Sequence, residues 1–330
     1  MKRVQHEGQF SRHQWRLHPR KSQSFLQGGS KLNTKVFDCL IIGGGPAGLV
    51  AATYLRRFYR EVLIIDSGDS RAKAIPVSHN YPGFANGIAG PELLLRLSEQ
   101  AQQYGATIVR GTVSELTAGN DGFCGIIGDR QVIARRVLVA TGLKDRSPKM
   151  LDLREAVTHA VLRYCSICDG FEATDRNIGV YGPVEIAESK AVFLRTYSRS
   201  ITLLPVDMSV DARAIKRMYE AGITLAPSVP VNFKAAESSV SVELQNGDHL
   251  QFDAIYPELG CKVHSDLASK LGARCNDVGC LEVDQKQQTS IEGIYAAGDV
   301  VSDLHQLAVA AGHAAIAATA IHRSLPNNYR

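Results

Sequence analysis

The stretch Gly43-Gly44-Gly45-Pro46-Ala47-Gly48 decides the fold of this chain. The apolar residues before it have the length of a buried strand, and residues 46–59 after it have helical periodicity. Asp66 ends the next apolar run. A G-x-G-x-x-G loop between strand and helix, followed by an acid at the end of the second strand, indicates a dinucleotide-binding unit. The glycines let pyrophosphate approach closely, and Asp66 can accept a hydrogen bond from a ribose hydroxyl.

The rest of the chain repeats this architecture on a smaller scale after Pro148. Strand-like and helix-like segments alternate there over residues 177–182, 185–197, 200–205 and 211–221. Short segments with turn residues predict antiparallel layers at 113–139 and 229–251, the second with an Asn246-Gly247 hairpin turn. A strand at 294–298 and a long Ala-rich helix at 306–324 complete the chain.

We therefore expect an α/β fold with two three-layer, dinucleotide-binding-type domains. A discontinuous Rossmann-like domain would comprise residues 36–150 and 255–330, with a smaller nucleotide-fold domain inserted at 151–254. Residues 1–35 would form a basic, flexible extension, with an organelle transit peptide as the alternative.

Composition narrows the class of protein. The chain has 330 residues, 45% of them hydrophobic, which suits about two domains. Its net charge is only +4, and the first 35 residues hold eight Lys or Arg against one acid, so the folded part is not expected to bind nucleic acid. We find no apolar run of the roughly 20 residues that a membrane span needs. Seven cysteines with a single redox-spaced pair favour the reducing cytoplasm.

That pair stands in Cys165-Ser166-Ile167-Cys168-Asp169. Two thiols three positions apart form a two-electron disulfide couple, in which one thiolate attacks a substrate disulfide and its partner resolves the mixed disulfide. The alternative is half of a zinc site, but Cys275 and Cys280 fit the spacing of a second half loosely, and we predict no metal. Asp169 is the candidate proton donor and acceptor, with a turn-capping role as its alternative.

Five motifs occur in the order and spacing of the low-molecular-weight thioredoxin reductases, which the chain resembles from Val36 to about Leu325: the glycine loop, Asn80-Tyr81-Pro82-Gly83, Ala140-Thr141-Gly142, Cys165 to Gly170 and Ala296-Ala297-Gly298-Asp299-Val300. The resemblance implies an FAD flavoprotein that is a homodimer whose domains rotate. It implies that Cys168 meets the flavin and Cys165 attacks the substrate, with Gln306 near the pyrimidine edge of the flavin. The expected cofactor-binding residues are Gly43, Gly45, Pro46, Ala47, Gly48, Asp66, Asn80, Ala140, Thr141, Gly142, Gly298, Asp299 and Gln306.

The second strand-turn-helix unit departs from that family. Its loop reads Gly182-Pro183-Val184-Glu185-Ile186-Ala187, where a pyridine-nucleotide loop would read G-x-G-x-x-A. We expect the Val184 side chain to block the pyrophosphate and Glu185 to repel it. Residues 203–208 contain no Arg or Lys for the 2′-phosphate of NADPH, and Asp207 would repel that phosphate.

These departures resemble thioredoxin-reductase-like flavoenzymes that do not use pyridine nucleotide, including ferredoxin-linked forms and diflavin-linked disulfide oxidoreductases. They imply an FAD-dependent thiol-disulfide oxidoreductase that does not use NADPH, with room for a second FAD and a ferredoxin-type donor. The disulfide partner is a thioredoxin-like protein or a small dithiol. Two alternatives stay open: a conventional NADPH-dependent thioredoxin reductase, and a redox sensor without turnover.

Four further residues are hypotheses of a weaker kind. An aromatic ring on the C-terminal tail, Tyr329, is a candidate to stack on a flavin, with a solvated tail as the alternative. Three histidines close to the cofactor segments are expected to be structural hydrogen-bonding residues: His79, His305 and His313.

Overall fold

The computed structural model describes residues 35–120, 122–301 and 304–329. The predicted basic extension therefore lies, apart from Lys35, outside the described residues. Among the described residues, no helix is both long enough and apolar enough to cross a bilayer.

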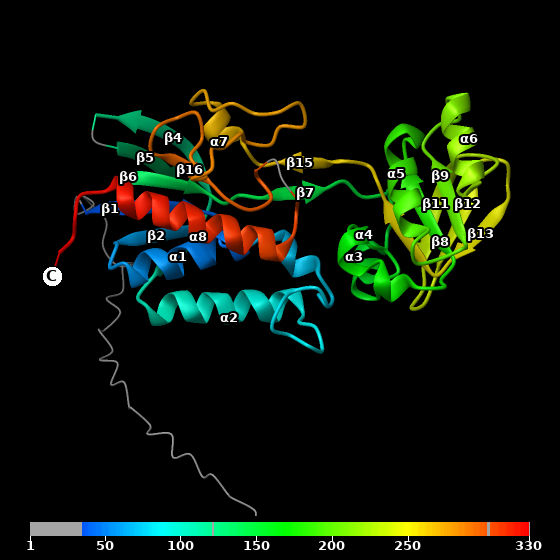
Figure 1. Ribbon diagram of the computed structural model, residues 1–330, viewed down its shortest axis with the longest axis horizontal. Helices are drawn as coiled ribbons and strands as arrows, with labels where there is room; N and C mark the ends of the chain where they lie inside the picture. The colour runs from blue at the N-terminus through cyan, green and yellow to red at the C-terminus, as the bar shows by residue number, and fades with distance from the viewer. Residues whose placement is uncertain (1–34, 121, 302–303, 330) are drawn as a thin grey trace, which may run out of the picture. The chain divides into compact units, whose positions relative to one another are not determined.

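The first strand-turn-helix unit forms as predicted (Figure 1). Strand β1 (Val36–Ile42) enters the glycine loop, helix α1 (Pro46–Arg57) leaves it, and β2 (Val62–Asp66) returns parallel to β1. Pro46 is suited to the first turn of α1 because the backbone N–H that proline lacks would have no partner within the helix.

A seven-stranded sheet is built on this unit, with the strand order β3-β2-β1-β6-β5-β4 and β16 beside β6. The central strand β6 (Arg130–Val139) pairs with β1 in parallel over most of its length. Its other edge pairs first with β5, antiparallel, and then with β16, parallel. The remaining strands are β3 (Thr107–Arg110), β4 (Val113–Gly119), β5 (Gly122–Ile127) and β16 (Ile294–Ala296).

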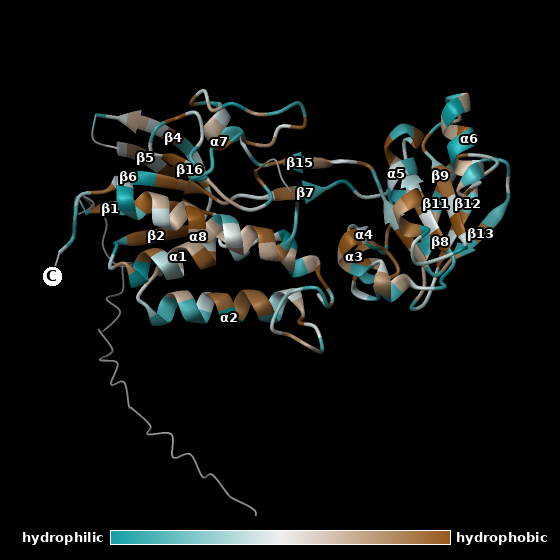
Figure 2. Cartoon of the chain, viewed as in Figure 1, coloured by the Kyte–Doolittle hydropathy of each residue, from teal (hydrophilic) through white to brown (hydrophobic). Residues whose placement is uncertain are grey.

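Two of the helices beside this sheet pack through small side chains. Ala51 and Ala52 of α1 and Ala314 and Ala317 of α8 (Leu307–Ser324) are fully buried in one apolar cluster. Alanines allow the two helices to approach closely over the glycine loop. Helix α2 (Gly90–Gln103) shows mixed hydrophilic and hydrophobic colours in Figure 2, as expected for a helix with one buried face.

A second, four-stranded parallel sheet has the order β10-β9-β8-β14. Strand β8 (Ile178–Gly182) lies between β9 (Ile201–Pro205) and β14 (Ala254–Pro257). Helices α5 (Val184–Leu194) and α6 (Ala212–Glu220) pack on it as the periodicity predicts. The elements that complete this part are β10 (Thr224–Leu225), the antiparallel β11 (Pro230–Ala235), β12 (Val240–Leu244) and β13 (His249–Phe252), α3 (Leu153–Thr158), α4 (Ser166–Asp169) and the 3-10 turn Phe171–Ala173.

The two sheets confirm the α/β fold class, and two details differ from the sequence prediction. The predicted boundary at 254/255 cuts through β14, which pairs with β8 as far as Pro257. A short antiparallel pair, β7 (Leu143–Asp145) with β15 (Cys261–Val263), was not predicted because three residues are too few for a periodic signal. Helix α7 (Asp266–Ser269) follows β15. The division into domains otherwise stays a prediction.

Candidate active site

The glycine loop is shaped for close approach by a ligand backbone. Gly43 has a φ of 113°, and a side chain there would collide with the Ala140 carbonyl. Gly48 packs against the Gly43 carbonyl in the same way. Asp66 accepts hydrogen bonds from the N–H groups of Gly44 at 3.2 Å and Gly68 at 2.9 Å. The carboxylate therefore stabilises the loop at the point where the sequence predicts a ribose contact.

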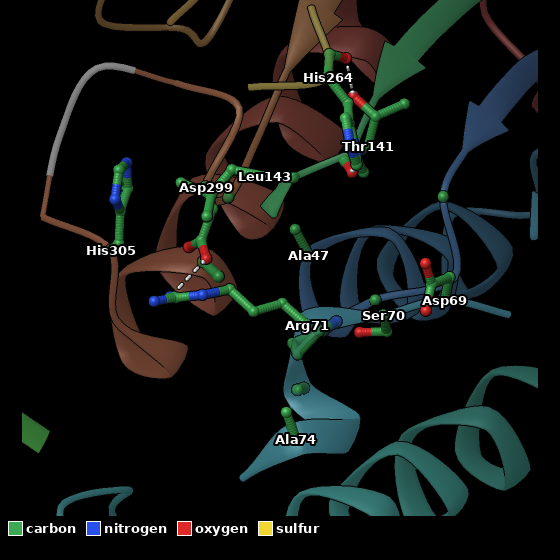
Figure 3. Close-up of a pocket in the computed structure, with 18 of the residues that line it drawn as sticks. Ala47, Asp69, Ser70, Arg71, Ala74, Thr141, Leu143, His264, Asp299 and His305 are labelled. Atoms are coloured by element: carbon green, nitrogen blue, oxygen red, sulfur yellow. Dashed lines mark hydrogen bonds and ion pairs between the residues drawn. The ribbon is translucent and has the colours of Figure 1, made fainter. Parts of the chain in front are cut away.

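The loop opens on a cavity of about 580 Å³, part of which is drawn in Figure 3. Gly48 is the one predicted site residue that does not line it, because it faces the Gly43 carbonyl and the Ile41 side chain. The other predicted residues all line the cavity: Gly43, Gly45, Pro46, Ala47, Asp66, Asn80, Ala140, Thr141, Gly142, Cys165, Cys168, Asp169, Gly298, Asp299 and Gln306.

Arg71 is a cavity residue that sequence reasoning missed. It lies in the 3-10 turn Arg71–Ala74, and its guanidinium bonds Asp145 at 2.6 and 2.9 Å. It also bonds Asp299 at 3.1 Å (Figure 3). Burial lowers the pKa of Arg71, but the bonds to the two carboxylates outweigh it, so the pKa is raised. Arg71 therefore stays charged and holds together β7 and the Gly298-Asp299 turn.

The two motif cysteines are joined in a disulfide, with their Cα atoms 5.2 Å apart. Both line the cavity, Cys168 on the short helix α4 and Cys165 as the residue that caps its start. The Cys165 sulfur also accepts a hydrogen bond from the Cys168 backbone N–H at 3.1 Å. A disulfide leaves neither sulfur as the thiolate that zinc requires, so the pair has the redox arrangement and not that of a half zinc site.

The surroundings of Asp169 favour the protonated form of its carboxyl group. The Tyr256 hydroxyl donates to its Oδ1 at 2.9 Å, and Arg163 lies 3.9 Å from its Oδ2. Burial is the largest influence and raises the pKa of Asp169 to about 6, while Arg163 and Tyr256 act in the opposite direction. A carboxyl group with this pKa can both hold and release a proton near neutral pH. Tyr256 and Arg163 were not singled out from the sequence.

The second strand-to-helix turn is shorter than the first, because Pro183 alone separates β8 from α5. A side chain on Gly182 would collide with the backbone of Glu258, and Glu258 forms an ion pair with Lys190. Val184 is 2% exposed and packs in the core beneath α5, so the prediction that its side chain blocks a pyrophosphate is wrong. Gly182 packs against the Glu258 carbonyl as Gly43 packs against the Ala140 carbonyl, so both turns are close-packed on the end of a neighbouring strand. Glu185 is exposed, as the predicted repulsion of pyrophosphate requires.

The four additional hypotheses have mixed outcomes. His305 lines the cavity, and His313 is buried within α8. His79 is exposed beside the cavity residue Ser78. Tyr329 is 89% exposed, and its stacking stays a prediction.

The described residues fit FAD, the cofactor that the sequence resemblance implies. Gly43 and Gly48 permit close approach, and Asp66 offers an acceptor at the end of β2. The Nε2 atom of His305 is buried at the cavity and has no hydrogen-bond partner among the described residues. A bound polar ligand would satisfy that nitrogen.

Residues 37–315 match the family model described as pyridine nucleotide-disulphide oxidoreductase. The chain is 30% identical over 318 residues to a thioredoxin reductase of Peptoclostridium acidaminophilum, covering 89% of this chain and 98% of that protein. A thioredoxin reductase of Bacillus subtilis is 29% identical over 301 residues, covering 87% and 94%. The crystal structure of a thioredoxin reductase from Streptococcus pyogenes matches with a TM-score of 0.81 at 26% identity, covering 88% and 98%. The chain therefore belongs to the pyridine nucleotide-disulphide oxidoreductase family, as a thioredoxin reductase-like FAD-dependent disulfide oxidoreductase.

Proposed function

We propose that this enzyme exchanges electrons between FAD and the Cys165–Cys168 disulfide without using NADPH. The observation that carries the proposal is the contrast between two turns. The three glycines Gly43 to Gly45 lie between β1 and α1 and line the cavity that Cys165 and Cys168 also line, whereas Pro183 alone lies between β8 and α5. The exposed carboxylates of Glu185 and Asp207, and the lack of Lys or Arg at 203–208, further disfavour a nucleotide phosphate there.

The chain's own residues account for the remaining chemistry. FAD, when bound, supplies a two-electron carrier. The glycine loop and Asp66 would hold its dinucleotide part, and Arg71 would keep the Asp299 turn in place for it. Reduction of the disulfide consumes two electrons and two protons and gives two thiols. Asp169 would supply one of those protons and take it back when a thiolate is needed.

The Cys165 thiolate would then attack the substrate disulfide, and Cys168 would attack the mixed disulfide and release the reduced substrate. The names of the relatives favour a thioredoxin-like protein as that substrate, with a small dithiol as the alternative. We propose a ferredoxin-type protein as the electron donor, and a cytoplasmic homodimer as the working form.

Photoreduction tests this proposal without any physiological donor. Under anaerobic conditions, light and EDTA would reduce the flavin of the holoenzyme, and oxidised thioredoxin or an aromatic disulfide would then be added. We expect the oxidised flavin spectrum to return in the wild type and to stay bleached in Cys165→Ser. Reoxidation at the wild-type rate in Cys165→Ser would reject the relay. A wild type that stays bleached with every disulfide would favour a sensor without turnover.

The flavin content tests whether a second FAD binds beside the Gly182 turn. Because that turn has no glycine loop between β8 and α5, we expect one FAD per chain after denaturation. A ratio of two would establish the diflavin form in place of a ferredoxin-linked one.

A further inference from the structure

The side-chain amide of Gln306 lies against the redox disulfide. Gln306 immediately precedes α8, and its Nε2 atom is 3.4 Å from the Cys165 sulfur and 3.3 Å from the Cys168 sulfur. The sulfurs of a disulfide carry no proton, so the amide N–H groups are the donors and both sulfurs are the acceptors. One side chain of the FAD-binding fold thus contacts both members of the pair.

A chain of hydrogen bonds fixes which end of the amide faces the sulfurs. The Oε1 atom of Gln306 accepts from Nδ2 of Asn80 at 3.0 Å, and Oδ1 of Asn80 accepts from the Ser78 hydroxyl at 3.2 Å. Ser78 is 5% exposed, and its backbone exchanges two hydrogen bonds with Ile88. The Gln306 oxygen accepts from Asn80 and lies 3.7 Å from the Cys168 sulfur, farther than the nitrogen at 3.3 Å, so the NH₂ group is the end nearer the sulfurs.

We propose that Gln306 is a positioning residue that stabilises the reduced form of the Cys165–Cys168 pair. A hydrogen bond from an amide strengthens when its acceptor becomes an anion. Two electrons and one proton convert the neutral disulfide into one thiol and one thiolate, so the donors of Gln306 favour the reduced side of this equilibrium. The inference rests on the proposed redox role of the pair.

This contact has a consequence for the direction of electron flow. While Gln306 faces the sulfurs, the disulfide is a better electron acceptor and is more readily reduced from the flavin. Once the cysteines leave Gln306 to meet a substrate, the dithiol loses that stabilisation and becomes a stronger reductant. Gln306 would therefore favour transfer from flavin to disulfide and then to substrate.

A thiol-disulfide equilibrium measures the effect directly. The holoenzyme would be equilibrated in glutathione redox buffers, and the free thiols would be alkylated and counted by mass spectrometry. We expect the equilibrium constant for reduction to fall about tenfold in Gln306→Leu, which corresponds to about 30 mV. In Gln306→Glu, a carboxylate would face the thiolate, and the fall would be larger. A matched control is Gln251→Leu, which removes a surface amide bonded to Ser239 and should leave the constant unchanged.

The outcomes separate the inference from the proposed function. If the wild-type pair does not titrate as a two-electron disulfide, the proposed function fails. If it does, but both Gln306 variants keep the wild-type constant, the inference alone is overturned. FAD content and thermal melting check that each variant is folded, and the near-isosteric Gln306→Glu still tests the contact if the leucine variant unfolds. The inference also requires that the reactive thiol has a higher pKa in Gln306→Leu than in the wild type. The ultraviolet absorbance of the thiolate, recorded as the pH is varied, measures this pKa.

Discussion

The two strand-turn-helix units of this enzyme share a backbone plan and differ at the turn. In the first, Gly43 adopts a φ of 113° and the turn opens on the cavity that holds the redox residues. In the second, Pro183 alone separates β8 from α5, and Glu258 lies against Gly182. A nucleotide-type fold can therefore lack a glycine loop at its turn, because strands and helix are held by their own apolar core.

The largest expected effect is a loss of FAD when the first turn is altered. Gly43→Ala adds a methyl group that collides with the Ala140 carbonyl, at a φ that alanine rarely adopts. We expect FAD affinity to fall at least about 100-fold, seen as a lower flavin-to-protein ratio after gel filtration. Gly247→Ala is the control, because it has a φ of 88° with no atom within 4 Å and lies in the β12–β13 turn. Normal FAD content in Gly43→Ala would contradict this account of the first turn.

Restoring a glycine to the second turn tests whether Val184 has a structural role. Because Val184 is buried in the core, Val184→Gly should lower the free energy of unfolding by about 2–4 kcal/mol in urea titrations. Ile186→Gly, on the same helix but 52% exposed, should cost only about 1 kcal/mol. Both variants should keep FAD and gain no NADPH binding. Tight NADPH binding by Val184→Gly would show that the valine side chain is the block.

Burial of Asp169 and its contacts with Arg163 and Tyr256 determine the protonation of its carboxyl group. The stability of the protein therefore depends on pH. Burial raises the pKa of Asp169 from 3.8 to about 6, so the folded protein binds the proton more tightly than the unfolded chain. This contribution is complete below about pH 4 and is lost as the pH rises through 6. At pH 8, Asp169→Asn should be more stable than the wild type by roughly 1–3 kcal/mol.

Urea unfolding at several pH values measures this difference, which should disappear toward pH 4. The exposed Glu237→Gln serves as a control with a small effect throughout. A stability difference that does not change with pH would contradict the assignment of the raised pKa to Asp169.

The smallest expected effect concerns Tyr256, whose hydroxyl favours the charged form of Asp169. Tyr256→Phe should raise the pKa of Asp169 further, because it removes the hydrogen bond that favours the carboxylate. Arg163 and Lys190 would still lower that pKa, and Glu172 would still raise it. We expect the corresponding limb of the pH–rate profile for disulfide reduction to move up by roughly 0.5–1 unit. The control Tyr181→Phe removes a hydroxyl on β8 and should leave the limb in place. An unmoved limb in Tyr256→Phe would remove Tyr256 from the proton site.

Local patterns in the sequence predicted most of the fold. The glycine loop, Asp66 and the helical periodicity of α1 and α5 are local signals, and the structure confirms those elements. The contacts of Arg71 with Asp145, 74 residues away, and of Tyr256 with Asp169, 87 residues away, depend on the tertiary fold. The inward direction of Val184 was missed for the same reason, since a loop motif does not tell which side of a helix start faces the core.

Anaerobic mixing with NADPH tests the central claim most directly. The wild-type holoenzyme would be mixed with a small excess of NADPH in a stopped-flow spectrometer, beside the Bacillus subtilis thioredoxin reductase as a positive control. Because the second turn lacks a glycine loop and no Lys or Arg stands at 203–208, we expect the flavin of this enzyme to stay oxidised with NADPH and to be reduced by light. Bleaching by NADPH at a rate near that of the control would contradict the account.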